Sequence, residues 1–290
     1  MSRPTFDLQS HSLHSDGALP AAEVVARAAQ AGVELLALSD HDTVDGVDEA
    51  QRAARQHGIA LTPAVEISSV QEEFEDLHVL GYGLDPTDRH LRDELARYRD
   101  DRLRRADRMA DALQDHGFEL DTAVIDERKR HGKPVGRPHL AQAAFDHPAN
   151  AAKIAEHGFG DFSDLLVAYL IPGTPAYRRR TFPSVEEAIA LIHDAGGVAI
   201  WAHPFWDIEA DPAVLASLER FRGWGMDGVE AFYVTHTREQ TLLLDDHASE
   251  HGLLTTGSSD FHGPQHPNFA TFLAHELHGR AANLGPIANV

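Results

Sequence analysis

The chain has 290 residues, of which 42% are hydrophobic, so it is long enough to bury the core of one large α/β domain or of a barrel with a small inserted domain. It contains no cysteine, which excludes disulfide bonds and thiolate metal sites. With 25 basic and 46 acidic residues the formal net charge is −21, and such a field repels long polyanions, so no extended nucleic-acid groove is expected.

Short apolar runs and helical patterns alternate along most of the chain. The runs predicted as strands are Thr5–Leu8, Leu35–Leu38, Ala60–Ile67, Leu77–Tyr82, Gly197–Trp201, Gly228–Tyr233 and Leu254–Gly257. The helical patterns are Pro20–Ala31, Val44–His57, Ser184–Ala195, Pro212–Trp224 and Arg238–His251. Strands that alternate with helices predict an α/β fold built on a parallel sheet or barrel.

This alternation stops between residues 88 and 177, where a long charged helix is followed by shorter helical pieces. The segment holds 14 of the 25 basic residues, and most of these charges are expected to form ion pairs along helix surfaces. We therefore expect a barrel made of residues 1–87 and 178–290, with residues 88–177 as a helical insertion domain.

The membrane and secretion signals that a sequence can carry are not seen in this chain. No apolar run reaches the roughly 18 residues that a membrane-spanning helix needs. The segment MSRPTFDLQSHS lacks the basic-then-apolar layout of a secretion signal, so a cytoplasmic location is expected. The oligomeric state is left open.

Side chains that bind metals lie in or directly after almost every predicted strand. They are Gln9, His11 and Asp16 after the first, Asp40, His41 and Asp42 after the second, Glu66 in the third, His78 in the fourth, His203 after the fifth, and Asp260 and His262 after the last. Sites in barrels and open α/β sheets form at the carboxyl ends of the strands. Residues i and i+2 of a strand face the same way, so Gln9 and His11 point together, as do Asp260 and His262.

The donor types narrow the choice of metal. Imidazoles and carboxylates without sulfur favour Zn, Mn or Fe over Ca or copper. A bound cation would also invert the local charge and admit a small anionic substrate. Other histidines of the 20 in the chain, such as His57, His116 and His251, fall on the surfaces of predicted helices, where no specific role is expected.

At these residues the sequence resembles the PHP (polymerase and histidinol phosphatase) family of metallophosphoesterases. The matching motifs, in chain order, are Gln9-Ser10-His11, Ser15-Asp16-Gly17, Ser39-Asp40-His41-Asp42, Glu66, His78-Val79-Leu80-Gly81-Tyr82, His203-Pro204 and Ser259-Asp260-Phe261-His262. The resemblance implies an α/β fold, a distorted seven-stranded (β/α) PHP barrel with a small helical insertion domain. It also implies two or three divalent metal ions per chain (Mn, Fe or Zn) in the barrel mouth.

Carried over position by position, the resemblance implies three metal positions. The first has His11, Glu66 and Asp260 with Gln9, the second has Glu66, His78 and His203, and the third has Asp16, His41 and His262. Gln9 is the departure, because the family has histidine there and an amide oxygen is a poorer ligand for Zn or Fe. The first position is therefore expected to be weaker or shifted toward Mn. His203, Asp16 and Glu66 are the residues expected to be catalytic.

The resemblance narrows to one branch at the stretch Gly136-Arg137-Pro138-His139 and the turn Ile171–Tyr177. That branch removes phosphate from nucleoside 3′,5′-bisphosphates or trims short oligoribonucleotides. For this chain it implies hydrolysis of phosphate monoesters of a small phosphorylated substrate, a nucleotide, by a metal-activated hydroxide. The residues expected to bind the substrate are Arg137, His139, Tyr233 and His236, with the insertion domain contributing to the pocket.

Three other functions stay open at this point. Histidinol phosphate phosphatase belongs to the same family. An amidohydrolase also uses a barrel lined by His and Asp, but it would need a lysine that bridges metals, and Lys129, Lys133 and Lys153 all lie outside the predicted strands. A metal-poor PHP barrel that serves as a structural or regulatory module is supported by Gln9 alone.

Overall fold

The computed structural model of the chain describes residues 3–72, 74–130, 135–180 and 182–289. They fall into two compact units, one within Met1–Ala96 and Phe182–Val290 and the other within Arg97–Thr181. The second unit lies mostly inside the insertion expected at residues 88–177, and its expected part in substrate binding stays a prediction. None of the helices in the described ranges is long and apolar enough to cross a membrane.

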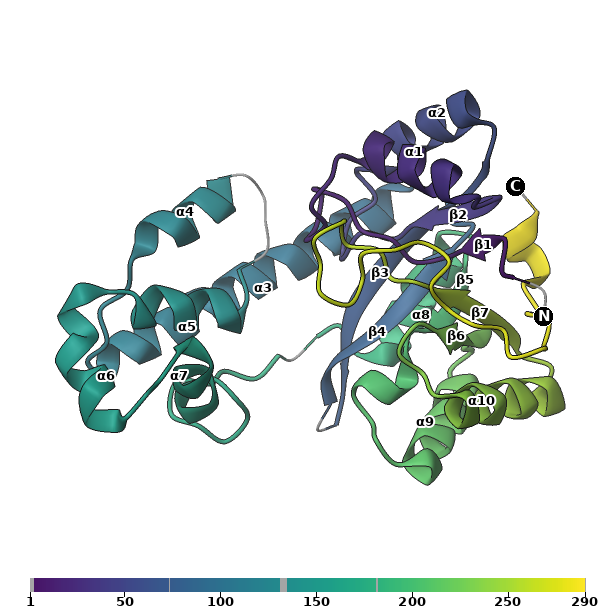
Figure 1. The fold of residues 1–290 in the computed structure, drawn as a ribbon. Coiled ribbons are helices and arrows are strands. Elements are labelled where there is room, and N and C mark those ends of the chain that lie inside the picture. The colour runs from purple at the N-terminus through teal and green to yellow at the C-terminus, as the bar shows by residue number, and fades with distance from the viewer. Residues whose placement is uncertain (1–2, 73, 131–134, 181, 290) are drawn as a thin grey trace. The chain divides into compact units, whose positions relative to one another are not determined.

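The first unit is built on a seven-stranded sheet in which the strands follow one another in chain order (Figure 1). The strands are β1 (Phe6–Asp7), β2 (Leu35–Leu38), β3 (Ala60–Gln71), β4 (Phe74–Tyr82), β5 (Val198–Trp201), β6 (Gly228–Tyr233) and β7 (Leu254–Ser258). The backbone N–H of Leu8 donates to the carbonyl of Gly257 at 3.1 Å, so the last strand returns to the first. The predicted distorted barrel is confirmed.

One strand runs against the other six. β4 is antiparallel to β3 and to β5, whereas every other neighbouring pair is parallel. The expectation that a helix follows each strand is wrong here, because β3 and β4 form a hairpin too short for a crossover helix. The reversal places His78 opposite Ser68, so its side chain is at the level of Glu66 rather than at the far end of the barrel.

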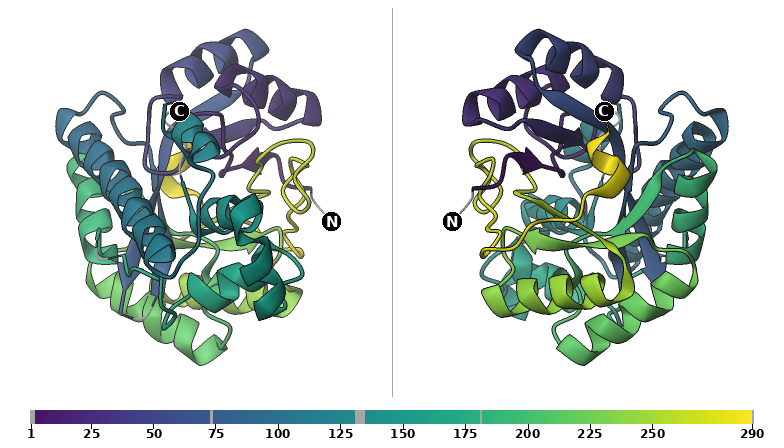
Figure 2. Two further views of the ribbon diagram at one scale, coloured as in Figure 1. Left: turned by 90° about the vertical axis from the view of Figure 1, so that its left-hand side faces the viewer. Right: turned by 90° about the vertical axis from the view of Figure 1, so that its right-hand side faces the viewer.

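Helices cover the outside of this sheet (Figure 2). They are α1 (Ala21–Ala31), α2 (Val47–His57), α8 (Val185–Asp194), α9 (Asp211–Gly223) and α10 (Arg238–His251), with the short 3-10 helices η2 (Pro204–Trp206) and η3 (Gly285–Ala288). In α1 the buried residues are Ala21, Val24, Val25 and Ala28, which is the spacing of one helix face. That face packs on Leu36 and Leu38 of β2.

The helix boundaries follow from local capping. Ser184 and Glu187 form a capping box at the start of α8, and Thr237 and Gln240 form another at the start of α10. Helix α10 ends at Gly252, whose left-handed backbone closes the last turn. These signals explain why the predicted helix over Arg238–His251 agrees with the structure.

The second unit is helical. It contains most of α3 (Arg89–Asp115), then α4 (Thr122–Arg130), α5 (Arg137–Phe145), η1 (Pro148–Asn150), α6 (Ala151–His157) and α7 (Phe162–Tyr169). Its own core includes Leu113, Phe118, Leu140 and Leu165, all nearly inaccessible to solvent. This separate core explains how a highly charged segment folds as a compact body.

Candidate metal centre

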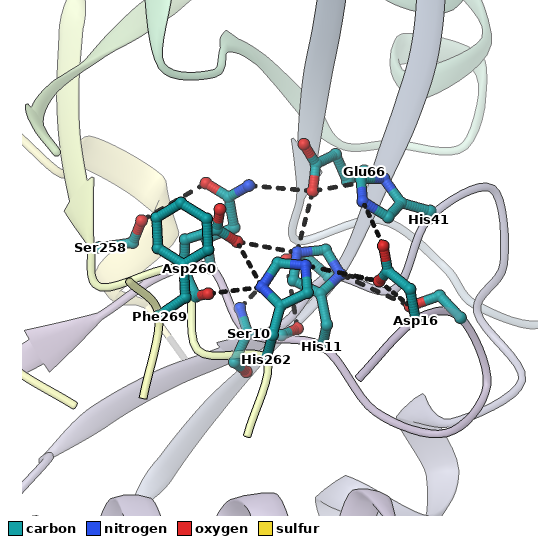
Figure 3. A network of polar contacts seen from close by, with 12 residues as sticks. Ser10, His11, Asp16, His41, Glu66, Ser258, Asp260, His262 and Phe269 are labelled. Atoms are coloured by element: carbon teal, nitrogen blue, oxygen red, sulfur yellow. Dashed lines mark hydrogen bonds and ion pairs between the residues drawn. The ribbon is translucent and has the colours of Figure 1, made fainter. Parts of the chain in front are cut away.

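The strand ends and hairpin of the first unit bring eight imidazole and carboxylate side chains to one place. They are His11 and Asp16 on the loop after β1, His41 after β2, Glu66 in β3, His78 in β4, His203 after β5, and Asp260 and His262 after β7. Figure 3 shows six of them, His11, Asp16, His41, Glu66, Asp260 and His262, pointing toward one another. The grouping that the sequence predicts is therefore present, while the metal-binding role of each residue stays a prediction.

The first group is fully buried and consists of His11, Glu66 and Asp260. Nε2 of His11 lies 3.1 Å from Oε2 of Glu66 and 3.0 Å from Oδ1 of Asp260. Within the described residues, neither that nitrogen nor Oδ1 of Asp260 makes a hydrogen bond of acceptable geometry. A buried imidazole nitrogen and a buried carboxylate oxygen that converge without hydrogen-bond partners fit a divalent cation.

The second group gathers on the other oxygen of the same glutamate. Oε1 of Glu66 lies 2.6 Å from Nδ1 of His78 and 3.2 Å from Nε2 of His203, and these two nitrogens are 3.3 Å apart. Glu66 thus presents one oxygen to each group. A carboxylate in this position can bridge two metal ions.

The third group is the most accessible one. Asp16, with 39% of its side chain exposed, has its carboxylate 3.6 Å from Nε2 of His41 and 3.5 Å from Nε2 of His262. Nδ1 of His11 is 3.7 Å from the same carboxylate, so the ring of His11 lies between the first and third groups. Of the three groups, this one is therefore the most accessible to solvent.

A hydrogen bond to a backbone carbonyl shows which ring nitrogen of His262 carries a hydrogen. Nδ1 of His262 lies 2.7 Å from the carbonyl oxygen of Asp260, and a carbonyl only accepts. Nδ1 therefore carries a hydrogen, and Nε2 is the ring nitrogen that faces Asp16. This arrangement, in which the second ring nitrogen donates to a carbonyl, is the usual one for a histidine that binds metal.

The charged groups of the centre strongly shift one another's pKa values. Burial alone raises the pKa of Glu66, but the neighbouring His41 and His78 hold this pKa well below its ordinary value. Burial also lowers the pKa of His11, yet the adjacent carboxylates of Asp260 and Glu66 bring it well above its ordinary value. The carboxylates therefore stay ionised and attract positive charge, which protons or divalent cations can supply.

Two further acids, which the sequence patterns do not indicate as functional, support the loops of the centre. Buried Glu230 accepts hydrogen bonds from the backbone N–H of His203 at 3.0 Å and from Oγ of Ser258 at 2.6 Å. Buried Asp7 accepts from the N–H and the hydroxyl of Ser259. Burial raises the pKa of Asp7 to about 7 and the pKa of Glu230 to about 8. The sequence signal that could have identified Asp7 and Glu230 is an acidic residue inside an otherwise apolar strand.

Backbone geometry at the centre is unusual. Three non-glycine residues next to or within it have positive φ, namely Asp42 at 52°, His203 at 28° and Asp260 at 52°. Such conformations cost energy and gather at functional sites. Gly17 has a different constraint, because a Cβ atom there would lie 2.2 Å from the carbonyl oxygen of His11. That contact explains the glycine of the Ser15-Asp16-Gly17 motif.

The predicted substrate-binding residues fall in both units. Tyr233 is buried, and its hydroxyl donates to Oδ2 of Asp260 at 2.8 Å. His236 packs its ring against Tyr233, with the ring centroids 5.4 Å apart. Arg137 and His139 lie in the first turn of α5 in the helical unit, where Nδ1 of His139 accepts from the N–H of Gly136 at 3.0 Å. Contact of these four residues with a substrate stays a prediction.

Comparison with known proteins shows which family and which proteins the chain is similar to. The PHP domain family matches residues 7–154. The 3′,5′-nucleoside bisphosphate phosphatase of Chromobacterium violaceum is 34% identical over 262 residues, which cover 89% of this chain and 87% of that protein. A 5′-3′ exoribonuclease of Haemophilus influenzae is 34% identical over 259 residues, with 89% of this chain and 90% of that protein covered.

Solved structures are similar to this chain as well. A Chromobacterium violaceum protein described as an amidohydrolase with bound sulfate has a TM-score of 0.75 and 30% identity, covering 96% of this chain and 94% of its own. A protein of Bifidobacterium adolescentis described as a metal-dependent phosphoesterase has a TM-score of 0.72 and 30% identity, covering 92% and 91%. Both likenesses extend over nearly the whole chain.

Proposed function

This chain belongs to the PHP domain family, and from that premise we propose that it is a metal-dependent phosphoesterase that hydrolyses phosphate esters of nucleotides. The substrates that we propose are nucleoside 3′,5′-bisphosphates or short oligoribonucleotides, the classes named for its two relatives. The observation that carries the proposal is the convergence of Glu66 with histidines and Asp260 in one buried cluster.

The residues present fit two or three divalent ions. Glu66 offers an oxygen to each of two groups, and Asp16 is the acid of the third. When bound, such ions neutralise charge on phosphoryl oxygens and lower the pKa of a water molecule toward neutrality. The absence of sulfur donors favours Mn, Fe or Zn.

The chain's own residues then have distinct tasks. Glu66 and Asp260 supply buried negative charge that would hold the cations. Asp16 lies at the exposed edge, where a phosphate group arrives and a water must be positioned. His203 is buried beside Glu66, with its backbone fixed by Glu230, so its ring can hold a proton close to the reacting groups.

Recognition of the nucleoside is proposed for an exposed aromatic residue beside the centre. Trp206 is 54% exposed, and its ring centroid lies 6.4 Å from that of His203 and 5.8 Å from that of Phe269. An exposed aromatic ring beside the centre is a surface on which a flat ligand can stack. A nucleobase is such a ligand, because every base offers a flat face for stacking.

The amidohydrolase alternative would need a lysine on a barrel strand, and none of the strands in the described part of the chain carries one. Lys129 is in α4 and Lys153 is in α6, both in the helical unit, and Lys133 lies outside the described residues. Histidinol phosphate phosphatase remains the second candidate, because it needs the same metal cluster.

The experiment is a substrate panel with Mn²⁺: adenosine 3′,5′-bisphosphate, AMP, a short 5′-phosphorylated RNA and histidinol phosphate. We expect release of the 3′-phosphate from the bisphosphate or trimming of the RNA, and loss of both after chelation. The matched inactive control is Glu66→Gln. Preference for histidinol phosphate over every nucleotide would overturn the proposal.

A further inference from the structure

A second cluster of possible metal ligands lies on the outside of the barrel, on the helices α9 and α10. Glu219 comes from α9, and His247 and His251 come from α10. Figures 1 and 2 both show these two helices side by side. The cluster shares no residue with the candidate metal centre.

The spacing in the sequence creates the pair of imidazoles. His247 and His251 are four residues apart on one helix, so their side chains lie over the same face, with ring centroids 4.3 Å apart. Oε1 of Glu219 lies 2.9 Å from Nε2 of His247 and 3.5 Å from Nε2 of His251. Each residue offers one donor atom, and the three atoms are all within 4.8 Å of one another.

Hydrogen bonds to groups outside the cluster determine which atoms of His251 and Glu219 face it. Nδ1 of His251 lies 2.8 Å from the carbonyl oxygen of His247, so Nδ1 carries a hydrogen and Nε2 is the ring nitrogen that faces the cluster. Oε2 of Glu219 accepts from Nε of Arg222 at 3.1 Å and from its Nη2 at 2.6 Å, which leaves Oε1 for the cluster.

The carboxylate is also kept in its charged form. Its hydrogen bond with Arg222 holds the pKa of Glu219 below the ordinary value. An ionised oxygen of Glu219 therefore lies 3.5 Å from Nε2 of His251. A divalent cation held between the donor atoms would be attracted by this charge.

We propose that Glu219, His247 and His251 form a separate site for Zn²⁺ or a similar transition metal ion. Two imidazoles and one carboxylate are a known ligand set for zinc, with the fourth position left to water. The side chains of His251 and Glu219 are 32% and 36% exposed, so water has access. A bound ion would tie α9 to α10 and stabilise the barrel wall.

The test is equilibrium dialysis of the full-length protein against Zn²⁺, with bound metal per chain measured by elemental analysis. We expect His251→Gln and Glu219→Gln each to bind one Zn²⁺ fewer than the wild type at low free Zn²⁺. The matched control is His57→Gln, because His57 is an exposed histidine at the end of another helix. All three variants should keep the wild-type turnover on a phosphate ester.

A spectroscopic measurement on the wild type makes the test independent of how the variants fold. The ring nitrogen signals of His247 and His251 in heteronuclear NMR should shift together when Zn²⁺ is added. Equal Zn²⁺ uptake by the wild type and by His251→Gln would overturn the site, as would ring signals that do not move. Failure of this site would leave the proposed phosphoesterase activity untouched, because the substrate panel tests that activity separately.

Discussion

The side-chain amide nitrogen of Gln9 donates a 2.9 Å hydrogen bond to Oε2 of Glu66, the oxygen that also faces Nε2 of His11. The amide oxygen of Gln9 points the other way, 3.4 Å from Oγ of Ser258. Turning the amide over would bring its oxygen against the carboxylate, which is repulsive. In this arrangement Gln9 holds the carboxylate of Glu66 in place through its N–H group.

Replacing this amide by an imidazole should tighten metal binding. Gln9→His would put a nitrogen ligand beside Glu66 and Asp260, and imidazole binds Zn or Fe better than an amide does. We expect about tenfold tighter retention of one metal ion, equivalent to roughly 1.4 kcal/mol. The measurement is metal content after dialysis against a graded series of EDTA concentrations. A variant that loses its metal as readily as the wild type would contradict this role for position 9.

Loss of a single cluster residue should abolish most of the activity without unfolding the protein. Asp16→Asn removes the charge that His41 and His262 share, and His203→Ala removes a ring that faces Glu66. We expect turnover to fall by about a hundredfold or more in each variant. Steady-state kinetics with saturating Mn²⁺ measures this, and circular dichroism checks the fold.

A nearby carboxylate outside the cluster serves as the control for Asp16. Asp45 lies on the loop after β2, is 46% exposed and pairs with Arg92 at 3.0 Å. Asp45→Asn makes the same chemical change at a surface ion pair, so turnover should stay at the wild-type level. Near-normal activity of Asp16→Asn on every substrate tested would remove Asp16 from the proposed machinery.

The sequence indicates that these side chains gather because most of them directly follow a strand, while Glu66 and His78 lie within strands. Apolar runs locate the strands, and the residues that follow a run such as Leu35–Leu38 must emerge at one end of the barrel. His41 and Glu66 therefore come together wherever the helices lie, and the structure pairs their backbones in a bridge. The direction of β4 was also within reach, since Gln71 and Phe74 are too close in sequence for a parallel crossover.

Other features depend on packing that a linear pattern does not contain. Glu230 supports His203 only because β6 lies next to β5, and nothing in its local sequence names that partner. His251 was expected to have no specific role, yet the rotation of α10 against α9 brings it to Glu219. To predict such a contact one must know how each helix is rotated about its own axis relative to the other. The periodicity of the sequence does not give that rotation.

Trp206 should affect the binding of a nucleotide more than the chemistry. Trp206→Ala removes the exposed ring beside His203, and stacking on a base is worth about 1–3 kcal/mol. We expect KM for adenosine 3′,5′-bisphosphate to rise about tenfold or more, with kcat little changed. Ribose 5-phosphate, which has no base, should show the same KM with both proteins, and Trp206→Phe should recover most of the lost binding. An equal rise in KM for both substrates would refute stacking.

The buried histidine His275 should make the free energy of unfolding depend on pH. His275 is 2% exposed, and within the described residues neither ring nitrogen has a hydrogen-bond partner. Burial lowers the pKa of His275 from 6.5 to about 4 in the folded chain. Between these two values the unfolded chain binds more protons than the folded chain, so the free energy of unfolding falls as the pH falls.

The loss from this histidine between pH 7 and pH 4.5 should be about 2 kcal/mol. His275→Phe keeps a ring against Phe6, whose centroid is 5.4 Å away, and removes the titrating group. Urea unfolding in EDTA at several pH values measures the effect without contributions from bound metal. We expect the curve of free energy against pH to be flatter for His275→Phe than for the wild type over this range, and unchanged for His57→Gln. Parallel curves for His275→Phe and the wild type would show that His275 is not buried in its neutral form.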